Sequence, residues 1–287
     1  MTNVCIATVT YPGVRSYLPE FFAALNHFKN YELYVLEQGE SGVAEFCDNV
    51  FSVSEDLSIP AVRSKLFSQL KETTDCPHYI FVDSDDRLRP NALDMHCEAL
   101  ENSDFSYGDQ VLYQKDFANP LGYTLFEKMH VPERLESVDD LMLGNCVGLS
   151  ALAVTRKGLE ALPENIPESL TAIDWFAAVR LLQSGLKGQR VGCVTDYRLK
   201  GQSLDVLGLP ETPDETVRRA QIVLHHYREL LDSEGVHSLV DKVKHLIEGV
   251  QKNPEFLLNL AKEILPEKFM WYEDVTKLAQ AYSQASA

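Results

Sequence analysis

The first 200 residues of this chain alternate short apolar runs with segments of helical spacing, and this alternation constrains the fold more than any other feature. Residues 4–9, 32–36 and 79–82 have the composition of buried strands. Residues 16–28, between the first two runs, carry large apolar side chains at helical intervals. Strands that alternate with helices are typical of an α/β protein with a largely parallel sheet. We therefore expect a mixed, mostly parallel sheet flanked by helices.

The pattern changes to nearly continuous helix from Thr212 onward. Thr212, Pro213 and Asp214 combine a helix cap, a first-turn proline and an acid near the positive helix end. Residues 236–250 then form an apolar stripe with a period of 3.6 residues. We expect residues 1–210 to form the α/β domain and residues 211–287 an all-α appendage. Its apolar stripes should pack against the first domain or form a homodimer.

Charge and cysteine content limit the classes of partner. The chain has 26 basic and 43 acidic residues, a net charge of -17, without a basic patch. This balance opposes binding to nucleic acid or to an anionic membrane surface. The six cysteines lack the spacing of a metal site, as in reduced cytosolic proteins. No signal peptide and no run of about 20 apolar residues is evident. We expect a cytoplasmic protein without a transmembrane segment.

Three carboxylates follow the apolar run 79–82 directly. Asp83, Asp85 and Asp86 repel one another unless a cation or hydrogen-bond donors compensate them. Carboxylate oxygens favour Mg²⁺ or Mn²⁺, and few protein ligands leave positions for substrate phosphates. In an open α/β sheet ligands bind beyond the carboxyl ends of the strands, where this cluster should lie. The alternative is a solvated acidic turn that caps the next helix.

Several segments spread over residues 3 to 205 follow one another in a recognisable order. They are VCIATVTYPGVRSYLPEFFAAL, LEQGESG, PAVRSKL, the acidic DSDD cluster, a segment over residues 144–185, and DYRLKGQSL. Together they resemble family 2 glycosyltransferases, which have the GT-A fold and in which the segment matched by 144–185 begins with a Gly-rich strand pair. The resemblance implies a site for a nucleoside diphosphate sugar. Its implied nucleotide-sugar-binding residues are Thr10, Tyr11, Pro12, Glu37, Arg63, Asp83, Ser84 and Lys200. Lys65 stands where the family more often has an asparagine.

The same resemblance assigns the metal and the catalytic base. Asp85, with Asp83, should hold Mn²⁺ or Mg²⁺ as the DxD motif of the family does. Lys200 replaces the family's histidine, and a protonated lysine cannot ligate a cation, so metal dependence is less secure than the fold. Asp174 falls on the family's general base, although Ile173 replaces the usual preceding acid. The alternative is that Asp174 only caps the helix that follows it.

The resemblance therefore implies an inverting hexosyltransferase-like enzyme. It would move a sugar from a nucleoside diphosphate donor, expected to be a UDP-sugar, to a hydroxyl of a saccharide-type acceptor. A non-catalytic sugar-nucleotide-binding module of the same fold is one alternative. A nucleotidyltransferase of related fold is another, but TYPGVRSY lacks its Gly-rich phosphate loop. A phosphatase of the haloacid dehalogenase type would carry its acidic motif after the first strand, not after some 80 residues.

Overall fold

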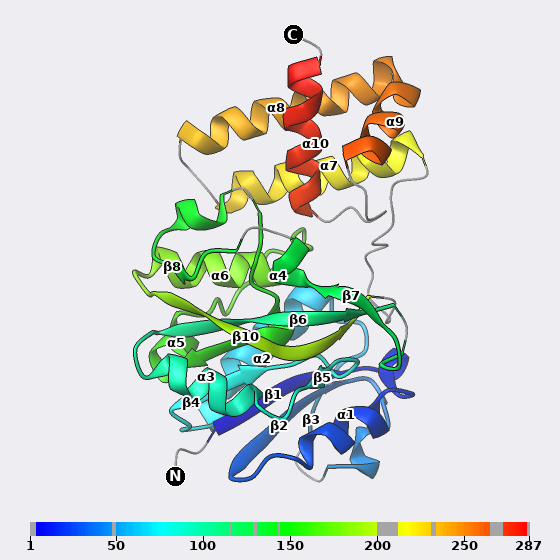
Figure 1. Ribbon diagram of the computed structural model, residues 1–287. Coiled ribbons are helices and arrows are strands. Elements are labelled where there is room, and N and C mark those ends of the chain that lie inside the picture. The colour runs from blue at the N-terminus through cyan, green and yellow to red at the C-terminus, as the bar shows by residue number, and fades with distance from the viewer. Residues whose placement is uncertain are drawn as a thin grey trace. The chain divides into compact units, whose positions relative to one another are not determined.

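The computed structural model describes residues 4–47, 50–114, 116–128, 131–142, 144–199, 212–230, 234–264 and 272–285 (Figure 1). The chain divides into two compact units. The sheet unit comprises Met1–Ser137, Cys146–Ser169 and Ile173–Ser203. The helical unit comprises Val138–Asn145, Leu170–Ala172 and Leu204–Ala287. The expected domain boundary at residue 210 lies outside the described residues.

Four parallel strands form one half of the sheet. They are β1 (Val4–Thr10), β2 (Tyr31–Gln38), β3 (Val50–Val53) and β4 (His78–Phe81), in the order β3-β2-β1-β4. All seven residues of β1 are buried, as its continuous apolar sequence predicts for a strand covered on both faces. Because the four strands are parallel, their carboxyl ends share one edge. The acidic turn, residues 83–86, follows β4 at this edge.

The other half of the sheet is mixed. Its longer strands are β6 (Phe105–Tyr113), β9 (Leu152–Thr155) and β10 (Gly188–Arg198). The short strands are β5 (Arg87–Leu88), β7 (Pro120–Thr124) and β8 (Arg134–Leu135). Strand β9 is antiparallel to both β4 and β6, whereas β6 and β10 are parallel. Gly108 allows β10 to approach β6, because a Cβ there would lie 2.0 Å from Val194 Cγ2.

Six helices belong to the sheet unit among the described residues. They are α1 (Leu18–Leu25), α2 (Ile59–Thr73), α3 (Ala92–Leu100), α4 (Leu125–Lys128), α5 (Arg156–Ala161) and α6 (Ile173–Gln183). Phe21 of α1 and Leu100 of α3 belong to one apolar cluster with Ile6 and Ile80 of the sheet. In Figure 1, α6 lies above strands β6 and β10, and α3 lies below them. The prediction of a mixed sheet flanked by helices is confirmed.

Two local expectations differ from the structure. Helix α1 is shorter than the apolar spacing over residues 16–28 suggests, and Pro19 lies in its first turn. The resemblance implies a Gly-rich strand pair at the start of the segment 144–185. Residues 144–148 instead form no strand, and a 3₁₀ turn, Leu149–Ala151, leads into the single strand β9. That turn delivers Ser150 to the acidic turn, as described below.

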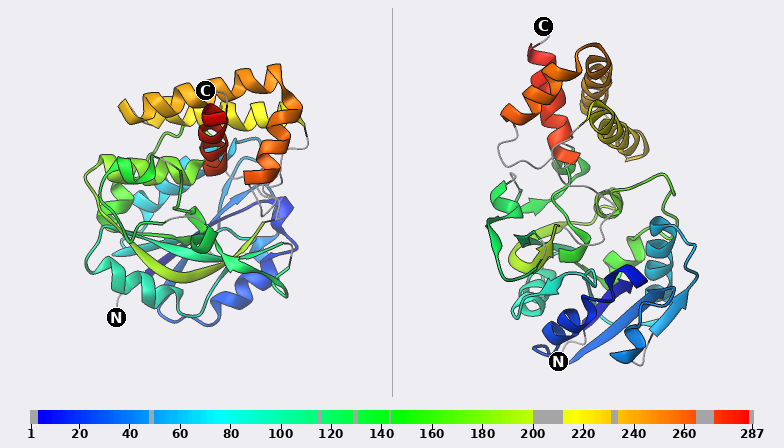
Figure 2. Two further views of the ribbon diagram at one scale, coloured as in Figure 1. Left: turned by 45° about the horizontal axis from the view of Figure 1, so that its top comes forward. Right: turned by 90° about the vertical axis from the view of Figure 1, so that its right-hand side faces the viewer.

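The helical unit contains α7 (Pro213–Leu230), α8 (Glu234–Lys252), α9 (Pro254–Ile264) and α10 (Tyr272–Ala285). Helices α7 and α8 lie side by side in Figure 1 and in both views of Figure 2, and α10 contacts both. The predicted stripe on α8 is buried at Leu239, Val243, Leu246 and Val250. His226 accepts hydrogen bonds from the amides of Thr171 (3.3 Å) and Ala172 (3.0 Å), which belong to the same unit.

Among the helices of the described residues, none is both long enough and apolar enough to cross a membrane.

Candidate nucleotide-sugar site

The acidic turn, residues 83–86, is fixed by hydrogen bonds to two other segments and by one within the turn. The amide of Asp83 donates to Ser150 Oγ at 3.0 Å, and Ser84 Oγ donates to the Val9 carbonyl at 2.8 Å. The amide of Asp86 closes the turn on the Asp83 carbonyl at 3.0 Å. Ser84 is buried and its hydroxyl contacts strand β1, and its contact with a nucleotide stays a prediction. These hydrogen bonds hold the turn at the carboxyl ends of β1 and β4.

The three carboxylates of this turn have different environments. Asp83 forms an ion pair with Arg63 of α2. Burial, and then the neighbouring Asp83, raises the pKa of Asp85 to about 6. Asp86 is buried, and its Oδ1 accepts the amide of Arg198 at 2.9 Å, while Oδ2 has no hydrogen-bond partner among the residues that the structure describes.

Burial, followed by Asp85 and Asp83, raises the pKa of Asp86 well above its usual range. The Ser150 side chain and the Arg198 amide oppose part of that rise. Asp85 and Asp86 thus both bind protons more tightly than exposed aspartates do. A cation that approaches the turn would favour the ionised form of Asp85.

A second polar cluster lies at the ends of β1 and β2. Ser41 donates from its amide (2.8 Å) and from its hydroxyl (2.6 Å) to Glu37 Oε1, and the same hydroxyl lies 3.0 Å from Thr10 Oγ1. Thr10 and Glu37 are neighbours in the register of the two strands. The structure thus brings together two predicted nucleotide-binding residues. Ser41, which sequence reasoning missed, lies within the quoted segment LEQGESG.

Tyr11 connects this cluster with the acidic turn. Burial, then Asp85 and Asp83, raises the pKa of its phenol, and Arg63 opposes the rise. Tyr11, Arg63, Asp83 and Asp85 are therefore electrostatic neighbours. Pro12 is exposed and begins the 3₁₀ turn Pro12–Val14.

Asp174 lies in the first turn of α6, and its Oδ1 accepts the amide of Trp175 at 2.8 Å. Asp174 and the acidic turn both affect the pKa of Tyr197 on β10. Burial raises the pKa of the Tyr197 phenol well above its usual range, and Asp86, Asp83, Asp85 and Asp174 raise it further, in that order. Asp174 and the acidic turn therefore act on the same side chain.

Two predicted features are not represented in the described part of the chain. Lys200 lies outside the described residues. Within the part of the chain that the structure describes, no group of three or more His, Cys, Asp or Glu side chains is arranged to hold a metal ion. Lys65, a departure from the family pattern, is exposed on α2.

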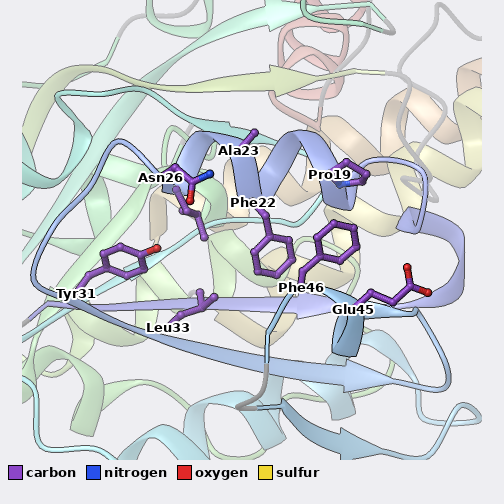
Figure 3. Close-up of a pocket in the computed structure, with 9 residues that line it drawn as sticks. Pro19, Phe22, Ala23, Asn26, Tyr31, Leu33, Glu45 and Phe46 are labelled. Atoms are coloured by element: carbon purple, nitrogen blue, oxygen red, sulfur yellow. The ribbon is translucent and has the colours of Figure 1, made fainter.

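A separate pocket of about 480 Å³ lies between α1, β2 and the turn that carries Phe46 (Figure 3). The rings of Phe22 and Phe46 stack there with centroids 5.1 Å apart. None of the predicted site residues lines this pocket.

No protein-family model matches the chain, and no curated protein matches it by sequence. Solved structures do match it. Staphylococcus aureus TarS 1-349 in complex with UDP-GlcNAc has a TM-score of 0.52 and 14% identity, over 99% of this chain and 92% of that one. The fold is GT-A-like. The mannosyltransferase PcManGT from Pyrobaculum calidifontis, in complex with GDP-Man and Mn²⁺, has a TM-score of 0.51 and 13% identity, over 99% and 75%. A longer TarS structure matches over 87% of this chain but 43% of its own length, with a TM-score of 0.49.

Proposed function

We propose that the protein is an inverting glycosyltransferase that moves a sugar from a nucleoside diphosphate sugar, with UDP as the expected nucleotide, to a hydroxyl of a saccharide-type acceptor. The observation that carries the proposal is the acidic turn. It lies at the strand edge of a GT-A-like sheet, beside Arg63, Tyr11 and the Glu37–Ser41–Thr10 cluster. Ligands of open α/β sheets bind at this edge. The similar structures hold UDP-GlcNAc in one case and GDP-Man in another.

The donor's nucleoside would meet the cluster of Thr10, Glu37 and Ser41, and its diphosphate would meet Arg63. A carboxylate such as Glu37 suits the donor N–H and O–H groups of a base or ribose. Arg63 is paired with Asp83, so a phosphate must compete with that carboxylate for the guanidinium. Asp83 released in this way can accept hydrogen bonds from the ribose.

The residues present fit a hard divalent ion that is held by few protein groups. Asp85, with Asp83, would supply carboxylates at the turn, and diphosphate oxygens would supply the other ligands. Asp86 Oδ2 is buried and has no hydrogen-bond partner within the described part of the chain. A bound Mn²⁺ or Mg²⁺ would neutralise the charge that develops on the leaving diphosphate. Asp85 must be ionised for this role, which its raised pKa permits at neutral pH.

Asp174 would act as the general base. The acceptor oxygen forms a bond to the anomeric carbon as the bond from that carbon to the diphosphate oxygen breaks. The acceptor's proton passes to Asp174, and the nucleoside diphosphate leaves with the bonding electron pair. Attack from the face opposite the leaving group inverts the anomeric centre.

Calorimetry with UDP, with and without Mn²⁺, tests the donor site. We expect Mn²⁺ to tighten UDP binding in the wild type, and Asp85→Asn to abolish that gain. Asp94→Asn is the matched control, because Asp94 is an exposed acid of α3 outside the site. A variant Asp85→Asn that binds UDP with unchanged affinity and unchanged cation dependence would remove Asp85 from the site. Saturable UDP binding without sugar transfer to any acceptor would instead favour the non-catalytic module.

A further inference from the structure

Arg198, the last residue of β10, is buried at the acidic turn although sequence reasoning did not single it out. Its side chain is 3% exposed. Its Nε donates to the Asp85 carbonyl at 2.9 Å, and its backbone amide donates to Asp86 Oδ1 at 2.9 Å. One residue therefore holds both the main chain and a side chain of the turn.

The guanidinium of Arg198 also contacts two aromatic rings. Its central carbon is 4.1 Å from the ring centroid of Tyr17 and 4.2 Å from that of Phe117. A terminal nitrogen donates to Glu20 Oε2 of α1 at 2.9 Å. The segment before α1, helix α1 itself and the loop between β6 and β7 thus all contact this one group. Together these contacts restrict the position of the guanidinium.

Phe117 also contacts a second arginine, Arg87. Arg87, which directly follows the acidic turn, lies over the same ring at 4.5 Å, and its Nη2 is 2.6 Å from Asp196 Oδ2. Phe117 therefore contacts two guanidinium groups, one from the residue that follows the turn and one from the end of β10. A buried charge is costly unless it is paired and hydrogen-bonded, and these contacts provide that compensation.

We propose that Arg198 is a positioning residue that fixes the peptide of Asp85 and thereby aims the Asp85 carboxylate at the diphosphate and its cation. The ligand in this statement rests on the proposed function, whereas the fixing of the turn does not. A lysine keeps the charge but has no planar group that can stack on the rings while it donates to a carbonyl and a carboxylate at once. Replacement of Arg198 by lysine therefore changes the contact geometry but keeps the positive charge.

Hydrogen exchange of the ligand-free protein tests the fixing of the turn. In Arg198→Lys we expect the Asp86 amide, which closes the turn, to exchange about tenfold faster or more, because hydrogen bonds to charged groups are lost. Arg190→Lys is the control, since Arg190 lies on the same strand but pairs with the exposed Glu133. Phe117→Leu is a second variant on a partly exposed loop, and it should speed exchange of the same amide in a chain that remains folded. Unchanged exchange at Asp86 in folded Arg198→Lys and Phe117→Leu would overturn the proposal.

Calorimetry of the same variants with UDP and Mn²⁺ tests the consequence for the ligand. We expect Arg198→Lys to weaken Mn²⁺ binding in the presence of UDP by about 10-fold or more, as loss of groups that orient metal ligands commonly does. UDP affinity in EDTA should change much less. Equal losses with and without Mn²⁺ would mean general damage and contradict the positioning role. If the wild type bound no nucleoside diphosphate, the proposed function would fail, while the exchange experiment would still decide whether Arg198 fixes the turn.

Discussion

Replacement of Asp174 by Asn distinguishes between two roles of this residue, catalytic base and helix cap. The structure sets the stability cost, because Oδ1 of Asp174 accepts the Trp175 amide and an Asn Oδ1 can accept the same bond. What is lost is a negative charge in the first turn of α6, which contributes about 0.3 to 1 kcal/mol at such positions. For a unit of this size, that amounts to a fall in melting temperature of at most about 4 °C.

The expected loss of activity is much larger. A positioned general base contributes about 10²- to 10⁴-fold to the rate, so Asp174→Asn should raise the barrier by about 2.7 to 5.5 kcal/mol. The assay is the rate of UDP release from a UDP-sugar in the presence of acceptor, together with calorimetric UDP binding and a thermal melt. UDP affinity should stay within about twofold of the wild type, because the base acts on the acceptor.

Asp94→Asn provides the matched comparison for Asp174→Asn. It removes a first-turn carboxylate from α3, so it should lose a similar amount of stability and no activity. If Asp174→Asn transferred sugar at the wild-type rate, the base assignment would be wrong. If it lost UDP binding and thermal stability together, the helix-cap interpretation would be supported instead.

Three further predictions concern stability and the diphosphate. Burial lowers the pKa of His96 to about 3. Below pH 6.5 the unfolded chain therefore binds a proton that the native chain excludes, so the free energy of unfolding decreases as the pH is lowered. Between pH 6.5 and 4.5 the wild type should lose about 2 kcal/mol more than His96→Gln in urea titrations, and parallel losses would contradict this. Gly108→Ala should lower the free energy of unfolding by about 1 to 3 kcal/mol through the Val194 clash, and an unchanged urea midpoint would refute the close strand approach. Lys200→Ala should weaken UDP binding more than uridine binding in calorimetry, and an equal effect on both ligands would remove Lys200 from the site.

The sequence predicts those parts of the site that lie next to their own strands. Apolar runs followed by polar residues locate β1, β2 and β4 and the carboxylates after β4, including Asp83. Strand ends are local features, so their periodicity and flanking residues can be read directly. The resemblance adds Glu37 and Arg63, and the structure pairs Arg63 with Asp83.

The supports of the acidic turn could not be predicted in the same way. Glu20 and Arg198 are 178 positions apart in the chain, and their ion pair depends on how β10 is placed beside β6. Ser150 reaches the turn from a 3₁₀ segment where the resemblance implied a strand. Periodicity carries no information about such long-range pairings. A signal for Arg198 was nevertheless present, because it lies two residues before Lys200 in the matched segment DYRLKGQSL.

The dependence of the acidic turn on β10 has a consequence for the order in which the protein acquires its site during synthesis. Strands β1, β2 and β4 and helices α1 and α2 are complete once residue 81 has been made. The groups that fix the turn, Ser150 and Arg198, arrive only much later, and the last of them ends the final strand of the sheet unit. Because chains emerge from the ribosome in order and long-range contacts form late, a nascent chain would carry the acidic residues long before it could bind a ligand with them. Ligand binding would then begin only after the sheet is complete.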